Sequence, residues 1–242
     1  NHLTSSANIT TVLVDGAPDA GTTDSSGGEN TLDLYCVAGM APQANIVMYV
    51  GVDNGIYYET NAANAAIDNS SSGWVNVINR AIDDGCDVIS CSWAYGEIYG
   101  NAYPNYYCGD FLADTFAKAS SKGVTFVTAA GDWGSYYSAN ANIKTATYPA
   151  TNSNVLAVGG THLIVNPGAG NVRISETVEY HDPGFVTSFG SGGGISAFVP
   201  VPAYQSGLTY RDYFSSNSSV GPIKSLTTRG VPDISAPMNS YA

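Results

Sequence analysis

The stretch GVTFVTAAGDWG (123–134) decides the fold class of this chain. Its short apolar centre is rich in β-branched and aromatic residues and ends at a Gly-Asp-Trp-Gly turn, which is typical of a buried β-strand. The segment before it, FLADTFAKASSKG (111–123), has helical spacing and ends at Gly123, a common residue after a helix. A helix that leads directly into a buried strand is the repeating unit of α/β proteins.

The same alternation recurs along the chain. The predicted strands are 9–14, 45–50, 87–92, 124–130 and 154–160, and the predicted helices are 29–40, 74–85 and 111–123. We therefore predict an α/β fold, in which a parallel sheet carries helices on both faces. After residue 161 Gly, Ser, Pro and Tyr dominate, and a hairpin is expected at 162–180. Because no repeat or linker interrupts the chain, residues 1–242 are predicted to belong to a single domain.

Two loops are expected to meet at one edge of this sheet. In parallel sheets, ligands bind beyond the carboxyl ends of the strands. The segments SCSWAYG (90–96) and AAGDWG (129–134) both follow predicted strands, so they mark the candidate site. Asp132 then stands in a tight turn at the mouth of a buried strand, where an acidic side chain calls for a chemical explanation.

The charge balance excludes several partners. The chain has 8 basic and 20 acidic residues and a formal net charge of −12, so nucleic acid and anionic membranes are unfavourable partners. Most carboxylates become neutral in acid, which suits an acid-tolerant secreted protein. No apolar run approaches the ~20 residues of a transmembrane helix. The chain has neither a signal peptide nor an initiator Met, as expected of a processed or partial chain.

Sequons for N-glycosylation begin at Asn8, Asn69 and Asn217. They favour an extracellular glycoprotein, although a chain rich in Asn and Ser also produces sequons by chance. The four cysteines allow three disulfide pairings, and free thiols are an alternative; these residues are Cys36, Cys86, Cys91 and Cys108.

Glu29 and Asp33 lie four residues apart in the predicted helix 29–40, so they are neighbours on one helix face. A different face, formed by Leu32, Tyr35, Cys36 and Gly39, is expected to pack on the sheet. The two carboxyl groups would then point along the sheet edge. Taken alone, the pair is better explained as a solvated acidic first turn that suits the helix dipole.

Six segments in a fixed order change that interpretation: GGENTLDL (27–34), VISCSW (88–93), VTAAGDWG (127–134), YPATNSNVLAVGGT (148–161), SGGGISAFVPVPAYQ (191–205) and RGVPDIS (229–235). Over nearly the whole chain this order resembles the sedolisins, the serine-carboxyl peptidases, which have a subtilisin-like fold. The ordinary subtilisins have a catalytic His at the start of the helix, where this chain has Glu29. The three histidines lie elsewhere, at His2, His162 and His181.

The resemblance implies a Ser-Glu-Asp triad. Glu29 would be the general base that takes the proton of the nucleophilic Ser, and Asp33 would orient Glu29. Asp132 would stabilise the tetrahedral oxyanion, and a carboxyl group donates a hydrogen bond only when it is protonated. A Glu base also has an ordinary pKa near ~4.3. Both requirements predict activity in acid.

The substrate side follows from the same resemblance. The backbone of Ser92 and Ala94 would pair with an extended peptide. Gly131 lies beside Asp132 in the turn, and Thr147 occupies the position at the base of the primary specificity pocket, where a neutral side chain disfavours a cationic substrate residue. Trp93 is interpreted either as a wall of a pocket or as a core residue. The sedolisins commonly have Gly in place of Ala94, and Trp133 is bulkier than the resemblance implies.

The nucleophile itself is not found. The resemblance places it in a Gly-Thr-Ser segment, which this chain does not contain, and it places the calcium ligands later still. An N-terminal strand and the segment with the Ser and the calcium site are therefore expected outside residues 1–242. Asp233 is interpreted as a structural carboxylate rather than a ligand.

Three explanations are open: the Ser lies on a second polypeptide or a further segment, the chain is an inactive fragment, or it is a non-catalytic relative that binds peptides. The first is favoured, because Glu29, Asp33 and Asp132 are all present. The expected function is a secreted or lysosome-like, acid-acting endopeptidase, with a tripeptidyl-peptidase as the alternative. A carbohydrate-binding module, suggested by the 17 tyrosines, gives no reason for these three carboxyl groups.

Overall fold

The computed structural model describes residues 7–17, 25–51, 72–98, 110–136, 144–178, 190–211, 213–214 and 219–241. Its helices are α1 (Ser25–Met40), α2 (Ser72–Asp83) and α3 (Ala113–Ser121). Its strands are β1 (Asn8–Leu13), β2 (Asn45–Val50), β3 (Val88–Cys91), β4 (Tyr95–Gly96), β5 (Thr125–Ala129), β6 (Thr147–Tyr148), β7 (Leu156–Asn166), β8 (Val172–Val178), β9 (Gly194–Pro200), β10 (Thr209–Tyr210), β11 (Tyr213–Phe214), β12 (Ser219–Val220), β13 (Lys224–Ser225), β14 (Thr228–Val231) and β15 (Ile234–Tyr241).

The predicted helices and strands are all present, with ends that differ by a few residues. The central sheet has the strand order β15-β7-β5-β3, in which neighbouring strands are parallel. β1 and β2 pair in parallel with each other and form a separate two-stranded sheet. β7 and β8 form the hairpin expected at 162–180, because the chain reverses through a short 3-10 turn at Pro167–Ala169.

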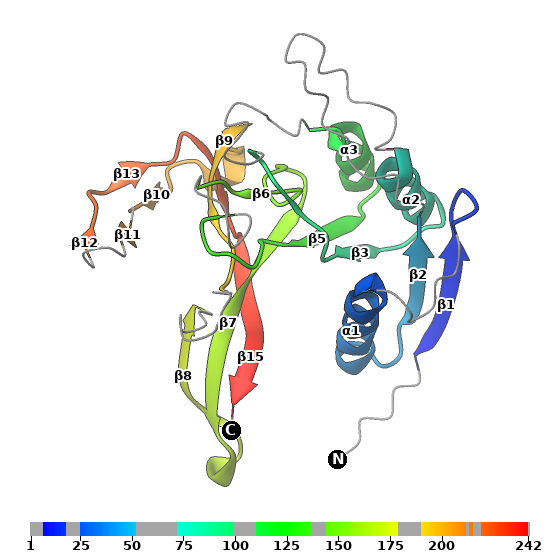
Figure 1. The fold of residues 1–242 in the computed structure, drawn as a ribbon, viewed down its shortest axis with the longest axis horizontal. Helices are drawn as coiled ribbons and strands as arrows, with labels where there is room; N and C mark the ends of the chain where they lie inside the picture. The colour runs from blue at the N-terminus through cyan, green and yellow to red at the C-terminus, as the bar shows by residue number, and fades with distance from the viewer. Residues whose placement is uncertain are drawn as a thin grey trace.

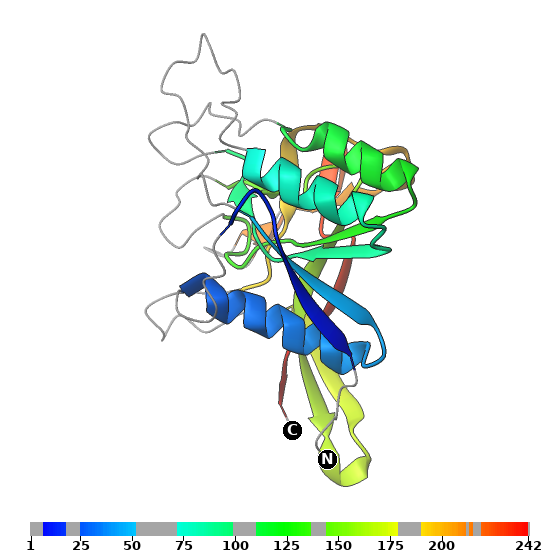
Figure 2. The same cartoon turned by 90° about the vertical axis from the view of Figure 1, so that its right-hand side faces the viewer.

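The helices cover both sides of the central strands, as predicted. In Figure 2, α2 and α3 lie on one side of β3 and β5, and α1 lies on the other. Figure 1 shows the long strands β7 and β15 side by side, with β8 against the far part of β7. The arrangement is the α/β architecture expected from alternating helices and apolar strands.

The main core lies between β5 and the pair α2 and α3. Ile78 and Ile82 of α2 pack with Phe116 of α3, and the rings of Phe116 and Phe126 of β5 have centroids 4.7 Å apart. Side chains along β5 alternate between buried and less buried positions, which is why the predicted run at 124–130 forms a strand. This packing fixes the position of the turn that follows β5.

The predicted packing face of α1 is wrong. Leu32 and Tyr35 are 56% and 75% exposed, and Cys36 is also exposed, whereas Ala38 is buried. The helix begins at Ser25 rather than at Glu29, so Glu29 lies in its second turn and does not belong to an acidic first turn. On the same helix Glu29 and Asp33 are half-buried.

Asp233 is a structural carboxylate, as predicted. It accepts hydrogen bonds from Arg229 Nη1 at 2.8 Å and Nη2 at 2.7 Å, and from the backbone N–H of Ala157 at 2.8 Å. Arg229 is fully buried. Burial would raise the pKa of Asp233, but the hydrogen bonds and the charge of Arg229 hold it below its ordinary value. The pair ties the start of β15 to β7.

The structure describes some, but not all, of the residues predicted to be glycosylated or to form disulfides. Asn8 is an exposed residue of β1, and Asn69 and Asn217 lie outside the described residues. Cys36, Cys86 and Cys91 are free thiols in the structure, and Cys108 lies outside the described residues. Within the described part of the chain, no helix is long and apolar enough to cross a membrane.

Candidate active site

The fold brings the three predicted catalytic carboxyl groups together. β3 and β5 are parallel neighbours, with Cys91 opposite Thr128, so the segments that follow them emerge at one edge of the sheet. α1 carries Glu29 and Asp33 to this edge. The negative charge of Asp33 and that of Asp132 both act on Glu29 strongly enough to raise its pKa. Carboxyl groups from two separate parts of the sequence, α1 and the turn after β5, therefore form one acidic site.

Ser92 lies against the two carboxyl groups of α1. Its Oγ is 2.9 Å from Oδ1 and 2.9 Å from Oδ2 of Asp33, and it donates to that carboxylate. Burial raises the pKa of Asp33, and the Ser92 hydroxyl opposes this rise. Burial also raises the pKa of Glu29; the carboxylates of Asp33 and Asp132 raise it further, and the Ser92 hydroxyl again acts in the opposite direction. The site thus favours the retention of a proton between its carboxyl groups.

Asp132 lies in the turn directly after β5. The residue is exposed overall, yet the surrounding chain removes enough water from its carboxyl group to raise its pKa. Its backbone carbonyl accepts a hydrogen bond from Gly190 N at 2.8 Å, and Gly134 N donates to Gly190 O at 3.2 Å. The turn is therefore held by the backbone of the 190–194 loop, which leaves the carboxyl group of Asp132 available for chemistry.

The glycines of the two loops permit their close approach. Gly131 has φ +102°, and a Cβ there would lie 2.8 Å from Cγ2 of Thr147. A Cβ at Gly192 would overlap the backbone carbonyl of Ala130. Gly192 N donates a hydrogen bond to Gly131 O. Glycine at these positions therefore permits the close backbone approach of the two loops.

The predicted substrate-binding residues lie around the same edge. Ser92 and Ala94 belong to the segment between β3 and β4, and β4 pairs with β6 so that Gly96 lies opposite Thr147. Thr147 is buried, and its Oγ1 donates to the carbonyl of Ala130 at 2.8 Å. That hydroxyl therefore braces the strand before Asp132. Whether these residues contact a substrate stays a prediction.

The two tryptophans occupy different settings. Trp93 is 44% exposed, which disfavours the core interpretation of this side chain and leaves the pocket wall as its predicted role. Trp133 lies within the Asp132 turn and makes β-bridges with Tyr136 and Gly190. Its backbone therefore belongs to the contact between the two loops.

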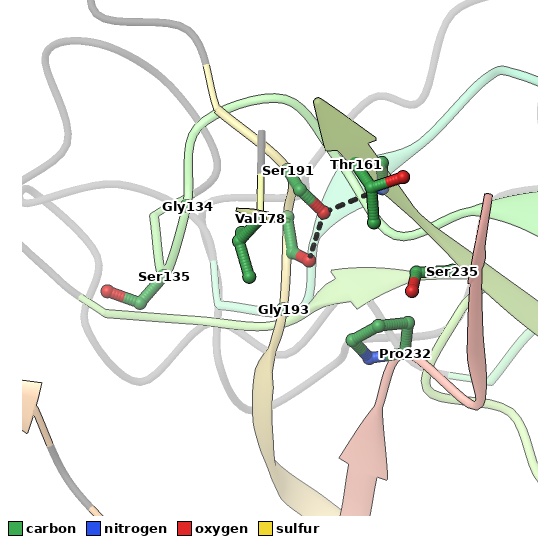
Figure 3. Close-up of a pocket in the computed structure, with 10 residues that line it drawn as sticks. Gly134, Ser135, Thr161, Val178, Ser191, Gly193, Pro232 and Ser235 are labelled. Atoms are coloured by element: carbon green, nitrogen blue, oxygen red, sulfur yellow. Dashed lines mark hydrogen bonds between the residues drawn. The ribbon is translucent and has the colours of Figure 1, made fainter. Parts of the chain in front are cut away.

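A cavity of about 330 Å³ lies next to the Asp132 turn. Figure 3 shows the 190–194 loop along one wall, where Ser191 Oγ accepts a hydrogen bond from Gly160 N at 2.8 Å and donates to Gly192 O at 3.3 Å. The cavity is lined by small polar and apolar groups, among them Ser135, Thr161, Val178, Pro232 and Ser235. None of the five predicted substrate-binding residues lines it. No sequence pattern predicts this cavity, because its walls come from five separate segments.

The described residues do not supply the calcium site that the resemblance implies. Among them, no group of three or more His, Cys, Asp and Glu side chains is arranged to hold a metal ion. The carboxyl groups of Glu29, Asp33 and Asp132 belong to the acidic site at the sheet edge, where their pKa values are raised chiefly by burial.

One residue of this site was assigned a different role by sequence. Ser92 was predicted to act through its backbone, but its side chain contacts Asp33. The spacing between residues 33 and 92 carries no local signal for this contact, since it depends on how α1 packs beside β3.

The chain is similar to known proteins over most of its length. The model of the subtilase family (peptidase S8) matches residues 19–240. The chain is 29% identical to kumamolisin from Bacillus sp. (strain MN-32) over 237 residues, which are 95% of this chain and 37% of kumamolisin. It is 30% identical to sedolisin from Pseudomonas sp. (strain 101) over 145 residues, which are 56% of this chain and 24% of that protein.

A solved structure shows the same fold. It is that of Pseudomonas sedolisin, described as a serine-carboxyl proteinase complexed with two molecules of pseudo-iodotyrostatin. The TM-score is 0.62 at 24% identity, and the match covers 96% of this chain and 58% of that one. The chain thus spans less than two thirds of the length of each of these relatives.

Proposed function

The chain belongs to the subtilase family and, within it, to the sedolisins, and from this premise we propose that it forms the base and oxyanion half of an acid-acting serine-carboxyl endopeptidase. The observation that carries the proposal is the convergence of Glu29, Asp33 and Asp132 at one sheet edge, where each of the three pKa values is raised. A carbohydrate-binding module has no use for three carboxyl groups that retain protons.

The proposed reaction is acyl transfer to a Ser. As the Ser oxygen attacks the peptide carbonyl, Glu29 takes its proton, and Asp33 holds Glu29 in place. The carbonyl oxygen becomes negative and accepts a hydrogen bond from protonated Asp132. Glu29 then gives its proton to the departing amine, which leaves an acyl-enzyme. In the second half, Glu29 takes a proton from water, the hydroxide attacks the ester, and the Ser regains its proton.

The substrate is proposed to be an extended peptide in the groove beside Ser92–Ala94. The segment lies outside the sheet pairing, between β3 and β4, where an extended chain could be added along its backbone. An endopeptidase needs an open groove on both sides of the scissile bond. Tripeptidyl-peptidase action, which requires a wall at one end of the groove, is the alternative.

The nucleophile is proposed to lie in a part of the protein other than residues 1–242, on the same or a second polypeptide. α1 supports this. The helix that carries Glu29 and Asp33 exposes Leu32, Tyr35 and Met40, the last at 88%, although such side chains are normally covered. A segment packed there would lie directly beside the general base. The enzyme is further proposed to act outside the cell or in an acidic compartment.

A serine-directed fluorophosphonate probe tests the position of the nucleophile. In the full-length protein at acid pH, the probe is expected to label a serine outside residues 1–242, and Glu29→Gln is expected to suppress the labelling. Peptide mapping by mass spectrometry locates the label. Labelling of a serine within residues 1–242 would show that the proposed location is wrong.

Replacements of Asp132 test the function. Asp132→Ala removes the donor to the oxyanion and is expected to lower kcat by about 10²–10³-fold. Asp132→Asn keeps a donor that requires no proton, so its activity is expected to extend to higher pH than that of the wild type.

Asp114→Asn is the matched control for these variants, because Asp114 is an exposed carboxyl group in the first turn of α3, away from the site. It is expected to leave the pH profile unchanged. Wild-type activity that is full at neutral pH and falls in acid would contradict the proposal, as would an Asp132→Ala variant with undiminished kcat.

A further inference from the structure

We propose that the side chain of Ser92 is a positioning residue for the Glu29–Asp33 pair, in addition to any contact that its backbone makes with a substrate. This inference rests on the proposed function and assigns to Ser92 a role in setting the acid limit of activity. From the sequence, Ser92 is predicted to act only through its backbone, and most residue types at this position could do the same.

The first support is geometric. Ser92 Oγ is 2.9 Å from each of the two carboxylate oxygens of Asp33, so its hydroxyl is within hydrogen-bonding distance of both. Ser92 is the first residue after β3, and β3 is held in register by β5. The hydroxyl is therefore presented from the sheet to the helix. It links the two elements whose relative position determines where Glu29 lies.

The second support is electrostatic. A hydroxyl that donates to a carboxylate favours its ionised form. The neighbouring titratable groups act the other way: Asp33 and Asp132 each raise the pKa of Glu29. Cys91, next in the chain, stays a neutral thiol because burial raises its pKa to about 11. Among the described residues, the donor that opposes burial at both Glu29 and Asp33 is Ser92.

The consequence concerns the proton that the pair shares. Glu29 acts as a base only when it has lost its proton, and two adjacent carboxyl groups titrate as a pair. With the Ser92 hydroxyl in place, the pair can release one proton at a lower pH. Without it, burial and mutual repulsion keep the pair protonated, and the base is lost in the acid range where Asp132 is the effective donor.

The test is the pH dependence of kcat/KM for Ser92→Ala in the full-length protein. A hydrogen bond to a charged group is strong enough for its loss to shift the acid limb upward by about one to two pH units. KM is expected to change little, because the backbone of residue 92 remains. Ser92→Thr keeps the hydroxyl and is expected to restore the wild-type limb. Ser121→Ala, which removes an exposed hydroxyl at the end of α3, is the control.

A second measurement separates this inference from the proposed function. Carboxyl ¹³C NMR titration of Glu29 and Asp33 reports their pKa values whether or not the protein cleaves peptides. Raised values in Ser92→Ala support the role of Ser92 even if the wild type proves inactive. If Ser92→Ala does not fold, Ser92→Cys, a weaker donor of similar size, is expected to shift the same limb. Unchanged pKa values and an unchanged acid limb in Ser92→Ala and Ser92→Cys would overturn the inference.

Discussion

Replacing Glu29 with Gln is expected to lower kcat/KM of the full-length protein by about 10²–10⁴-fold, the range that a general base supplies. Gln keeps the size of the side chain and its hydrogen-bonding shape but cannot take a proton. The half-buried position of Glu29 on α1 changes little with this substitution, so the loss should appear in kcat rather than in the free energy of unfolding. Steady-state kinetics with a peptide substrate in acid, beside a urea titration, measures both.

The pH profile sharpens this test. In the wild type the acid limb reports the ionisation of the Glu29–Asp33 pair. In Glu29→Gln the pair no longer exists, so the residual activity should lose that limb. Asp114→Asn again serves as the control, since it neutralises an exposed carboxylate without entering the site. If Glu29→Gln has activity near that of the wild type and keeps the acid limb, Glu29 is not the general base.

The fold was predictable because its signals are local. The run 124–130 is bounded by Gly123 and Gly131, and its strand and the preceding helix need only short-range patterns. The same holds for the position of Asp132, because the carboxyl end of a parallel strand lies at a known edge. The prediction of the candidate catalytic carboxyl groups rested on the order of six motifs, since Glu29 and Asp33 alone form a weak pattern.

The orientation of α1 was not predictable in this way. Periodicity marks Leu32, Tyr35 and Cys36 as an apolar face, and an apolar face is expected to pack inward. In the structure this face is exposed, while Ala38 is buried. The apolar pattern and the exposure of this face agree if a further segment of the protein covers it, so that α1 lies between that segment and the sheet. A pattern within the helix reveals that a face will be covered but not by which partner.

The contact between Ser92 and Asp33 is a second feature that the periodicity of the sequence cannot predict. It joins residues 59 positions apart, and its geometry depends on the packing of a helix beside a strand. The same is true of the cavity beside Asp132, whose walls come from distant parts of the chain. Features of this kind require the tertiary structure, because no local sequence signal accompanies them.

Removal of the carboxylate partner of Arg229 is expected to be the most destabilising change in this part of the fold. Arg229 is fully buried, and Asp233 is the carboxylate that receives both of its Nη groups. In Asp233→Ala the guanidinium loses its carboxylate and keeps neutral partners, the carbonyls of Asn152, Val155 and Gly230 and the ring of Tyr204. An uncompensated buried charge costs about 3–5 kcal/mol, so the free energy of unfolding should fall by that amount.

The Arg229–Asp233 pair should continue to stabilise the fold in acid until the pH is well below the ordinary pKa of Asp. The pKa of Asp233 is lowered in the folded state, so the stability it supplies is present above the ordinary value and is lost as pH falls through the folded value. Glu29, Asp33 and Asp132 have raised pKa values, so their ionised forms weaken the fold as pH rises. The structural pair therefore stays ionised under the acid conditions in which the site retains its protons.

Two variants make this stability test decisive. Asp84→Ala breaks the exposed pair between Arg80 and Asp84, and it is expected to change the unfolding midpoint in urea very little. The double variant Arg229→Met/Asp233→Leu removes both buried charges and should recover much of the loss, because the penalty arises from the unpaired guanidinium. If Asp233→Ala unfolds at the same urea concentration as Asp84→Ala, the buried pair does not hold β15 to β7. The edge that carries Asp132 would then depend on the apolar core around Phe116 and Phe126 for its position.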